Sequence, residues 1–276
     1  ATDKTTFGSL AEIAEAKGLN EAHTFLTNMQ RINALDTYIN SFCKGIQQNV
    51  YENGILHPQI NQVRTATGRL SSSKPNFQNL PRGGTARVRK AIVSRFEGGK
   101  VLEGDFAQLE FRTAVWVADD PVGKKEINEG FDVHAYTAKV LTEAGQETSR
   151  QDAKAHTFAP LFGATGYGRS PAEAEYYTHF IKKYKGIAAW HKKLGDEAIR
   201  FQKITNVGGR QYAFPDVQRR PKGKVSHFTM IKNYPVQGFA TGDVVPVVLN
   251  EMHERLRHMK SCLVNTVHDS MVVDVH

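Results

Sequence analysis

Apolar residues recur every three or four positions along the N-terminal part of the chain. They begin after Asn20, a residue suited to N-capping, and this spacing predicts one long amphipathic helix. The helix should end before Val50, because Asn53 and Gly54 lie between apolar residues and favour a tight hairpin. The apolar positions of this helix are Phe25, Met29, Ile32, Leu35, Ile39, Phe42 and Ile46.

The central part of the chain changes period several times. An irregular polar stretch over 64–82 is followed by a short strand around 101–102 and a helical pattern over 107–118. Residues 121–224 have a mostly helical pattern, interrupted by Gly and Pro, with a short hairpin over 206–216.

The C-terminal part predicts a helix over 238–258 and then a strand, a tight turn and a second strand. Apolar and polar residues alternate on both sides of His268 and Asp269, which is the period of a strand. Strands in three separated pieces with a helical insertion predict an α+β fold rather than a repeated βαβ array.

Composition narrows the class of protein. The 276 residues suffice for one large or two modest globular units. No run of about 18 apolar residues predicts a membrane span, and the N-terminus lacks the apolar core of a signal peptide. Cys43 and Cys262 are the only cysteines, too few for a disulfide framework or a zinc site, which suits a reducing cytosol.

A formal net charge of +8 favours a polyanionic partner, such as nucleic acid or an anionic membrane surface. The cations cluster over 82–90, 182–193 and 219–224. The simpler interpretation of each run is a solvated surface, so the motifs must decide.

Three groups of residues carry candidate chemistry. Asp105 ends the central strand and precedes Gln108 and Glu110, a spacing that a helix cap alone would also explain. His268-Asp269-Ser270 lies at the tip of the terminal hairpin, where turn chemistry is the simpler explanation.

The third group is two cations and two aromatic residues spaced four apart between positions 150 and 162. This spacing predicts one stripe along a helix that Thr148 or Ser149 would cap. Two cations followed by two rings suit a ligand with a polyphosphate end and a flat base, although an amphipathic boundary helix stays open. Together the three groups fit phosphoryl transfer, in which two Mg²⁺ ions need two carboxylates and cations neutralise the departing phosphates. The stripe consists of Arg150, Lys154, Phe158 and Phe162.

The order and spacing of these motifs resemble family A DNA polymerases, relatives of bacterial DNA polymerase I and of bacteriophage replicative polymerases. The family signature T-x-T-G-R-L-S-S…P-N-x-Q-N-x-P is matched by TATGRLSSSKPNFQNLP over 65–81. The resemblance implies that primer–template DNA is a partner, positioned through backbone and minor-groove contacts. The residues that would contact DNA are Arg69, Asn76, Gln78, Asn79, Tyr167, Asn233 and Gln237.

The same resemblance assigns the catalytic parts. Motif A, D-Y-S-Q-I-E-L-R, appears as DFAQLEFR, so Asp105 would bind two Mg²⁺ ions together with Asp269 of motif C and the Phe106 carbonyl. Lys154 of motif B would act in catalysis, and Glu110 would be the steric gate against a ribose 2′-OH. The residues that would bind the dNTP are Gln108, Glu110, His134, Arg150, Lys154, Phe158, Phe162 and His268.

The resemblance also implies a right-hand polymerase fold with an antiparallel palm sheet, mostly helical fingers and a partial thumb. Residues 1–60 would form the partial thumb helix and hairpin, and 61–120 the first part of the palm with motif A. Fingers with motif B would span 121–224, and the second part of the palm with motif C would span 225–276. The chain resembles a polymerase core fragment without an exonuclease domain.

Several positions depart from the family pattern. Phe162 replaces a Tyr that would bond Glu110, which predicts weaker exclusion of ribonucleotides, and Pro160 should kink the motif B helix. Ser270 replaces the motif C Glu, and Thr229 stands where bacterial members carry Arg. The HDS variant and compact fingers favour a bacteriophage replicative enzyme acting in bacterial cytoplasm, and the related organelle polymerases are the alternative source.

The leading hypothesis is a template-directed DNA polymerase that binds primer–template DNA and dNTPs and has no membrane partner. A processivity factor is a further candidate partner that the sequence does not decide. A single-subunit RNA polymerase is disfavoured, because an enzyme that accepts ribose needs a small residue at Glu110. A non-catalytic fragment that only binds primer–template DNA is the alternative from another class. A metal-dependent phosphohydrolase ranks third, because no second His-rich segment supplies further ligands.

Overall fold

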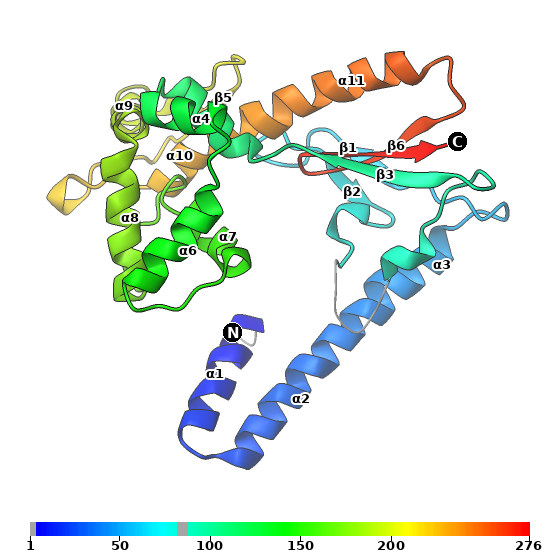
Figure 1. Cartoon of the computed structure of the whole chain (residues 1–276), viewed down its shortest axis with the longest axis horizontal. Coiled ribbons are helices and arrows are strands. Elements are labelled where there is room, and N and C mark those ends of the chain that lie inside the picture. The colour runs from blue at the N-terminus through cyan, green and yellow to red at the C-terminus, as the bar shows by residue number, and fades with distance from the viewer. Residues whose placement is uncertain (1–3, 82–87) are drawn as a thin grey trace. The chain divides into compact units, whose positions relative to one another are not determined.

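The computed structural model describes residues 4–81 and 88–276 (Figure 1). Contacts between Cα atoms divide the chain into two compact units. The first unit comprises Ala1–Asn61, Ser71–Leu102 and Asp274–His276, and the second comprises Gln62–Leu70 and Glu103–Val273.

The first unit begins with a helical hairpin. Helix α1 (Lys4–Ala16) packs against α2 (Asn20–Thr37), which continues through a π-helical turn, η1 (Tyr38–Cys43), into α3 (Lys44–Asn49) (Figure 1). The long helix predicted from the apolar spacing is confirmed. Asn20 is wrong as its N-cap, because it is already the first helical residue and Leu19 precedes it without a side-chain cap.

A hairpin and a second pair of strands follow in the same unit. Val50 bridges Leu56 in antiparallel fashion, and Gly54 takes a φ of 76°, which confirms the tight hairpin. Strand β1 (Gln59–Asn61) pairs with β2 (Ser71–Ser73), and the short helices η2 (Phe77–Asn79) and η3 (Val88–Ala91) come next.

A three-stranded sheet carries the predicted terminal hairpin. Strands β3 (Lys100–Asp105), β6 (Cys262–Val267) and β7 (Ser270–Val275) have the order β3-β7-β6. The strand near 101–102 and the strand–turn–strand pattern are confirmed, and Asp105 is the last residue of β3. Small antiparallel strand pairs beside many helices confirm the α+β class.

The main core of the second unit is helical, as the pattern over 121–224 predicted. Its largest cluster of buried side chains is centred on Phe111, Leu141, Leu161, Tyr176 and Ile187. The helices around it are α4 (Leu109–Val117), α5 (Pro121–Asn128), α6 (Val133–Glu143), α7 (Arg150–Thr157), α8 (Pro171–Lys183) and α9 (Lys185–Phe201).

The second unit continues with the expected small hairpin, β4 (Lys203–Thr205) paired with β5 (Gln211–Ala213), and a short helix, η4 (Pro221–Gly223). Helix α10 (Phe228–Gln237), the π-helical η5 (Gly238–Val244) and α11 (Val245–Leu256) then follow without a break, and α11 packs against β6 (Figure 1). The predicted start at 238 is wrong by ten residues. Pro235 lies inside α10, where burial of Ile231 and Val236 holds a helix that the local sequence disfavours.

Within residues 4–81 and 88–276, every helix is too short or too polar to span a bilayer.

Candidate active site

The end of β3 meets the turn between β6 and β7. The backbone N–H of Phe106 donates to the Asp269 carbonyl at 3.3 Å. Phe106 directly follows Asp105, so this bond ties Asp269 to the residue beside Asp105, although 164 positions separate the two acids. His268 in the same turn takes a φ of 58°, which tightens the connection. Asp105 does not cap the next helix, since the N-cap residue of α4 is Gln108 in the left-handed conformation.

Two aspartates match the ligand set that a magnesium ion takes from a protein. Magnesium keeps several waters and is commonly held by one or two carboxylates together with substrate phosphates. Among the residues that the structure describes, no group of three or more His, Cys, Asp or Glu is placed to hold a metal by itself. Asp105 and Asp269 are thus the candidate ligands, and they would hold magnesium only jointly with a phosphate.

Ser270, which replaces the motif C Glu, is buried and bonds across the sheet. Its hydroxyl donates to Oε1 of Glu103 at 3.0 Å and lies 3.1 Å from the Val267 carbonyl. Glu103 precedes Asp105 by two residues on β3, so both side chains leave the same face of the strand. A carboxylate is thus present beside Ser270, contributed by the neighbouring strand.

Glu110 in the first turn of α4 forms an ion pair with Arg69. The Gln237 amide is best satisfied with its nitrogen donating to Thr67 at 3.0 Å and its oxygen accepting from Arg69 at 3.0 and 3.2 Å. Gln237 therefore supports Arg69 rather than bonding Glu110 directly. Phe162 has no hydroxyl that could donate to Glu110. The Glu110 carboxylate nevertheless has a partner, which is Arg69.

Backbone geometry fixes the segment that carries Arg69. Gly68 has a φ of 82°, and a Cβ there would lie 2.6 Å from the Arg210 guanidinium carbon. Arg210 is itself held by Asp243 at 2.8 Å. Gly242 lets the Thr67 carbonyl approach η5, since a Cβ at that glycine would lie 2.8 Å from it. Only glycine fits both positions without displacement.

The cationic stripe is shorter as a helix than predicted. Ser149 caps α7 by accepting from the Asp152 N–H at 3.2 Å, which agrees with the predicted cap, but the regular helix ends at Thr157. Phe158 is the C-cap residue, and Phe162 lies beyond it in a series of turns. The single four-residue stripe is therefore wrong at its end. Pro160 stops the helix rather than kinking it, because its ring disfavours helical backbone at Ala159.

Arg150, the first residue of α7, pairs with Asp132 at 2.7 Å. The Arg150 bond, followed by the N–H groups of Ala135 and His134, holds the pKa of the Asp132 carboxyl below its ordinary value. The sequence analysis assigned a role to His134 but none to Asp132. An aspartate directly before the first residue of a helix is typical of an N-cap, and that pattern could have indicated Asp132.

Burial, followed by the charges of Arg150 and Lys154, lowers the pKa of His134. The ring Nδ1 lies 3.0 Å from the Thr157 hydroxyl, and the ring meets Phe158 edge to face at 5.3 Å. Three predicted dNTP-binding elements, the start of α6 and both ends of α7, are therefore in one neighbourhood.

A cavity of about 260 Å³ joins motif A to these elements. Its walls include Gln108 and Phe111 on one side and Asp132 and Arg150 on the other. Phe111 also stacks on Phe158, with ring centroids 5.2 Å apart. The cavity therefore has a cation and aromatic side chains at its border, as a nucleotide would require.

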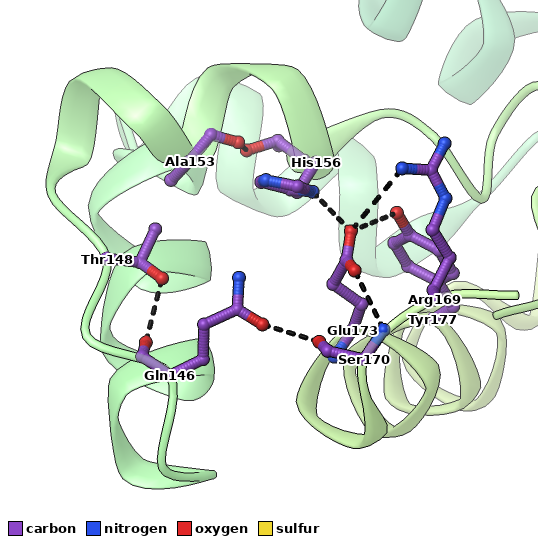
Figure 2. Close-up of polar contacts among 9 residues, drawn as sticks. Gln146, Thr148, Ala153, His156, Arg169, Ser170, Glu173 and Tyr177 are labelled. Atoms are coloured by element: carbon purple, nitrogen blue, oxygen red, sulfur yellow. Dashed lines mark hydrogen bonds and ion pairs between the residues drawn. The ribbon is translucent and has the colours of Figure 1, made fainter. Parts of the chain in front are cut away.

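Glu173, at the start of α8, anchors the far side of α7 (Figure 2). His156 of α7 approaches its carboxylate at 2.8 Å, and the side chains of Arg169 and Tyr177 converge on it (Figure 2). Burial alone would raise the pKa of Glu173, but the Ser170 N–H and the cations outweigh it and lower the pKa. This buried carboxylate holds α7 on the side away from Arg150 and Lys154, which are exposed.

The remaining predicted residues are dispersed. Tyr167 is 95% exposed, while the buried Oδ1 atom of Asn233 has no hydrogen-bond partner within residues 4–81 and 88–276. Asn76, Gln78 and Asn79 belong to the first unit, where Asn76 accepts from the Gln78 N–H at 3.1 Å.

The basic runs differ in their use of charge. Residues 82–87 of the first run lie outside the described residues. Lys183 of the second run pairs with Glu126 at 2.7 Å, and its Nζ lies 4.0 Å from the centre of the Tyr136 ring. Its charge is therefore used in contacts within the protein. Arg219 of the third run pairs with Asp196.

Comparisons with known proteins agree with this geometry. The sequence model described as DNA polymerase family A matches residues 2–276. The chain is 30% identical over 288 residues to "DNA polymerase I, thermostable" of Thermus aquaticus, covering 99% of this chain and 34% of that protein. It is 25% identical over 291 residues to DNA polymerase I of Geobacillus stearothermophilus, covering 98% of this chain and 32% of that protein.

A solved structure shares the fold. It is described as the POL domain of Pol1 from M. smegmatis in complex with DNA primer-template and dNTP. The TM-score is 0.75 at 25% identity, over 100% of this chain and 50% of that chain. The chain spans about one third of the length of the curated relatives.

Proposed function

The chain belongs to DNA polymerase family A, and from this membership we propose that it adds deoxynucleotides to a primer 3′-OH on a template strand, releasing pyrophosphate. The observation that carries the proposal is the junction of β3 with the β6–β7 turn, where Phe106 bonds Asp269. This bond supports the proposal because it ties the residue after Asp105 to Asp269, and nucleotidyl transfer would need both carboxylates at one pair of ions.

Each part of the site has a role in this proposal. Asp105, Asp269 and the Phe106 carbonyl would hold two Mg²⁺ ions, which supply a clamp for the attacking and leaving oxygens. Arg150 and Lys154 would neutralise the triphosphate, and Lys154 would stand nearest the departing pyrophosphate. Phe158 would stack on the incoming nucleotide, with Gln108, His134 and His268 lining its polar edge.

Each unit carries residues that the proposal assigns to DNA. Arg69, Tyr167, Asn233 and Gln237 would contact the primer–template in the second unit, and Asn76, Gln78 and Asn79 in the first. The proposal includes the division into thumb over 1–60, palm over 61–120 and 225–276, and fingers over 121–224. A bacteriophage origin, a cytoplasmic location and a processivity factor remain parts of it.

Primer extension with Asp105→Ala and Asp269→Ala tests the assignment. Each variant should lose at least about a hundredfold in rate, because each removes one of two carboxylates that would hold the ions. Asp196→Ala, which removes an exposed acid of the same unit, is the matched control and should keep the rate. Undiminished synthesis by either site variant would refute the assignment.

The same experiment separates the alternatives. A fragment that only binds DNA would retain primer–template with a steep salt dependence and incorporate nothing in the presence of Mg²⁺. A relative of single-subunit RNA polymerases would incorporate NTPs as readily as dNTPs.

A further inference from the structure

The gate carboxylate of Glu110 is positioned by a cation rather than by an aromatic hydroxyl. Arg69 pairs with Glu110, and the two side chains are 27% and 23% exposed, so the pair is largely shielded from water. Phe162, the position at which a hydroxyl could have served, instead packs against the main hydrophobic cluster of the second unit. Shielding makes such a charged hydrogen bond stronger than one on an open surface.

Arg69 is itself held from several sides. Its Nε donates to the Thr241 hydroxyl at 2.8 Å, and that hydroxyl donates to the Gln237 carbonyl at 2.7 Å. The Gln237 amide oxygen accepts from both terminal nitrogens of Arg69 in its better-satisfied orientation. A planar guanidinium bonded at Nε and at its terminal nitrogens has one orientation, so Arg69 presents a fixed donor to Glu110.

We propose that Arg69 is the positioning residue for Glu110 and thereby determines how strongly the site rejects a ribose 2′-OH. The inference rests on the proposed polymerase function. A carboxylate pinned by an ion pair keeps its volume over the sugar, whereas an unpinned one rotates and accepts a hydrogen bond from the 2′-OH. Arg69 therefore takes over the task of the missing hydroxyl at Phe162, and exclusion of ribonucleotides is retained rather than weakened.

The consequence for substitutions is specific. Removing the Arg69 guanidinium frees Glu110. The family resemblance implies that a hydroxyl at position 162 would reach Glu110, so Phe162→Tyr should pin the carboxylate again. In the parent chain the same hydroxyl adds little, because Glu110 already has its donor. If Arg69 contacted only DNA, its removal would not change the preference for dNTPs over rNTPs, and Phe162→Tyr would not restore that preference.

The test measures single-turnover incorporation of a dNTP and the matching rNTP by the full chain on primer–template DNA. Four variants are compared with the parent: Arg69→Met, Phe162→Tyr, the double variant, and Arg64→Met. Arg64 is an exposed cation five residues upstream in the same segment, so its loss controls for weakened DNA binding. For each nucleotide the maximal incorporation rate is divided by the Kd for that nucleotide. The quantity compared between variants is the dNTP value divided by the rNTP value.

Arg69→Met should lower the dNTP preference by roughly tenfold, the loss expected when one charge-assisted hydrogen bond no longer fixes the gate. Phe162→Tyr alone should leave the preference unchanged, the double variant should recover it, and Arg64→Met should slow both sugars equally. An unchanged ratio in Arg69→Met, or a double variant no better than Arg69→Met, would overturn the proposal.

A double-mutant cycle of unfolding free energies measures the Arg69–Glu110 interaction without any substrate. It compares Arg69→Met, Glu110→Gln and the double variant with the parent chain. Non-additive shifts of the urea midpoint support the pairing, and additive shifts overturn it. If the parent chain incorporated neither dNTP nor rNTP, the proposed function would be refuted instead. The double-mutant cycle would still show whether Arg69 and Glu110 interact.

Discussion

Replacing Lys232 with methionine should stabilise the protein at neutral pH. The Lys232 side chain lies within the second unit on α10, is only 6% exposed, and makes no ion pair or hydrogen bond to any residue that the structure describes. The ring of Phe228 lies 4.1 Å from its Nζ. His191 is also buried and faces it from α9, but burial and the Lys232 charge lower the pKa of His191 to about 3, so the ring is neutral.

The magnitude follows from the amine. Burial lowers the pKa of Lys232 from its ordinary 10.5 to about 8. The difference corresponds to about 3 kcal/mol of destabilisation while the amine is charged. The Phe228 ring offsets about 1–2 kcal/mol of this through its attraction for the cation. Methionine fills a similar volume without a charge, so Lys232→Met should gain about 1–3 kcal/mol at pH 7.

The sign of the pH dependence is fixed by the direction of the shift. Between pH 8 and 10.5 the unfolded chain binds the proton that the folded chain has lost, so the parent gains stability as pH rises. The advantage of Lys232→Met should therefore be full below pH 8 and shrink toward pH 10.5.

Urea unfolding at pH 7, 8, 9 and 10 measures the difference. Lys193→Met, which removes an exposed amine from α9, is the control and should change stability by less than about 0.5 kcal/mol. A loss of stability in Lys232→Met at pH 7, or a gain that does not vary with pH, would refute the reasoning.

Two further substitutions test contacts around the site. Glu173→Gln should cost about 1–2 kcal/mol at pH 7 by urea unfolding, and the cost should shrink as pH falls below 4.5, because the lowered pKa of Glu173 stabilises the fold only while it is ionised. Equal losses in Glu175→Gln, an exposed acid of the same helix, would contradict this. Ser270→Ala should cost about 1 kcal/mol through its lost bond to Glu103, whereas Ser270→Thr should keep part of it; identical midpoints for parent and alanine variant would argue against that bond.

Local patterns sufficed where the structure is determined locally. The β6–β7 hairpin follows from alternation on both sides of a two-residue turn, and α7 starts where Ser149 supplies a cap. The start of α10 could not be found this way. Pro235 and Gly238 are typical of loops, and burial of Ile231 and Val236 overrides that local preference.

The contacts within the candidate site were less accessible. Arg69 and Glu110 are 41 residues apart, and a pattern within either motif carries no information about the other. The Ser270–Glu103 bond likewise joins strands 167 positions apart. The family motifs supply the candidate residues, while the partners of those residues depend on tertiary packing.

The π-helical η5 determines where this stretch of the chain can change in length. A π turn holds about one residue more than the α-helical turn that it replaces. Deleting one residue within Gly238–Val244 and rewinding the segment as an α-helix would therefore leave α11 close to its present rotation, with Val245 still buried. The same deletion inside α11, which has no extra residue, would turn every later side chain by about 100°. One-residue deletions should therefore be tolerated better in η5 than in α11.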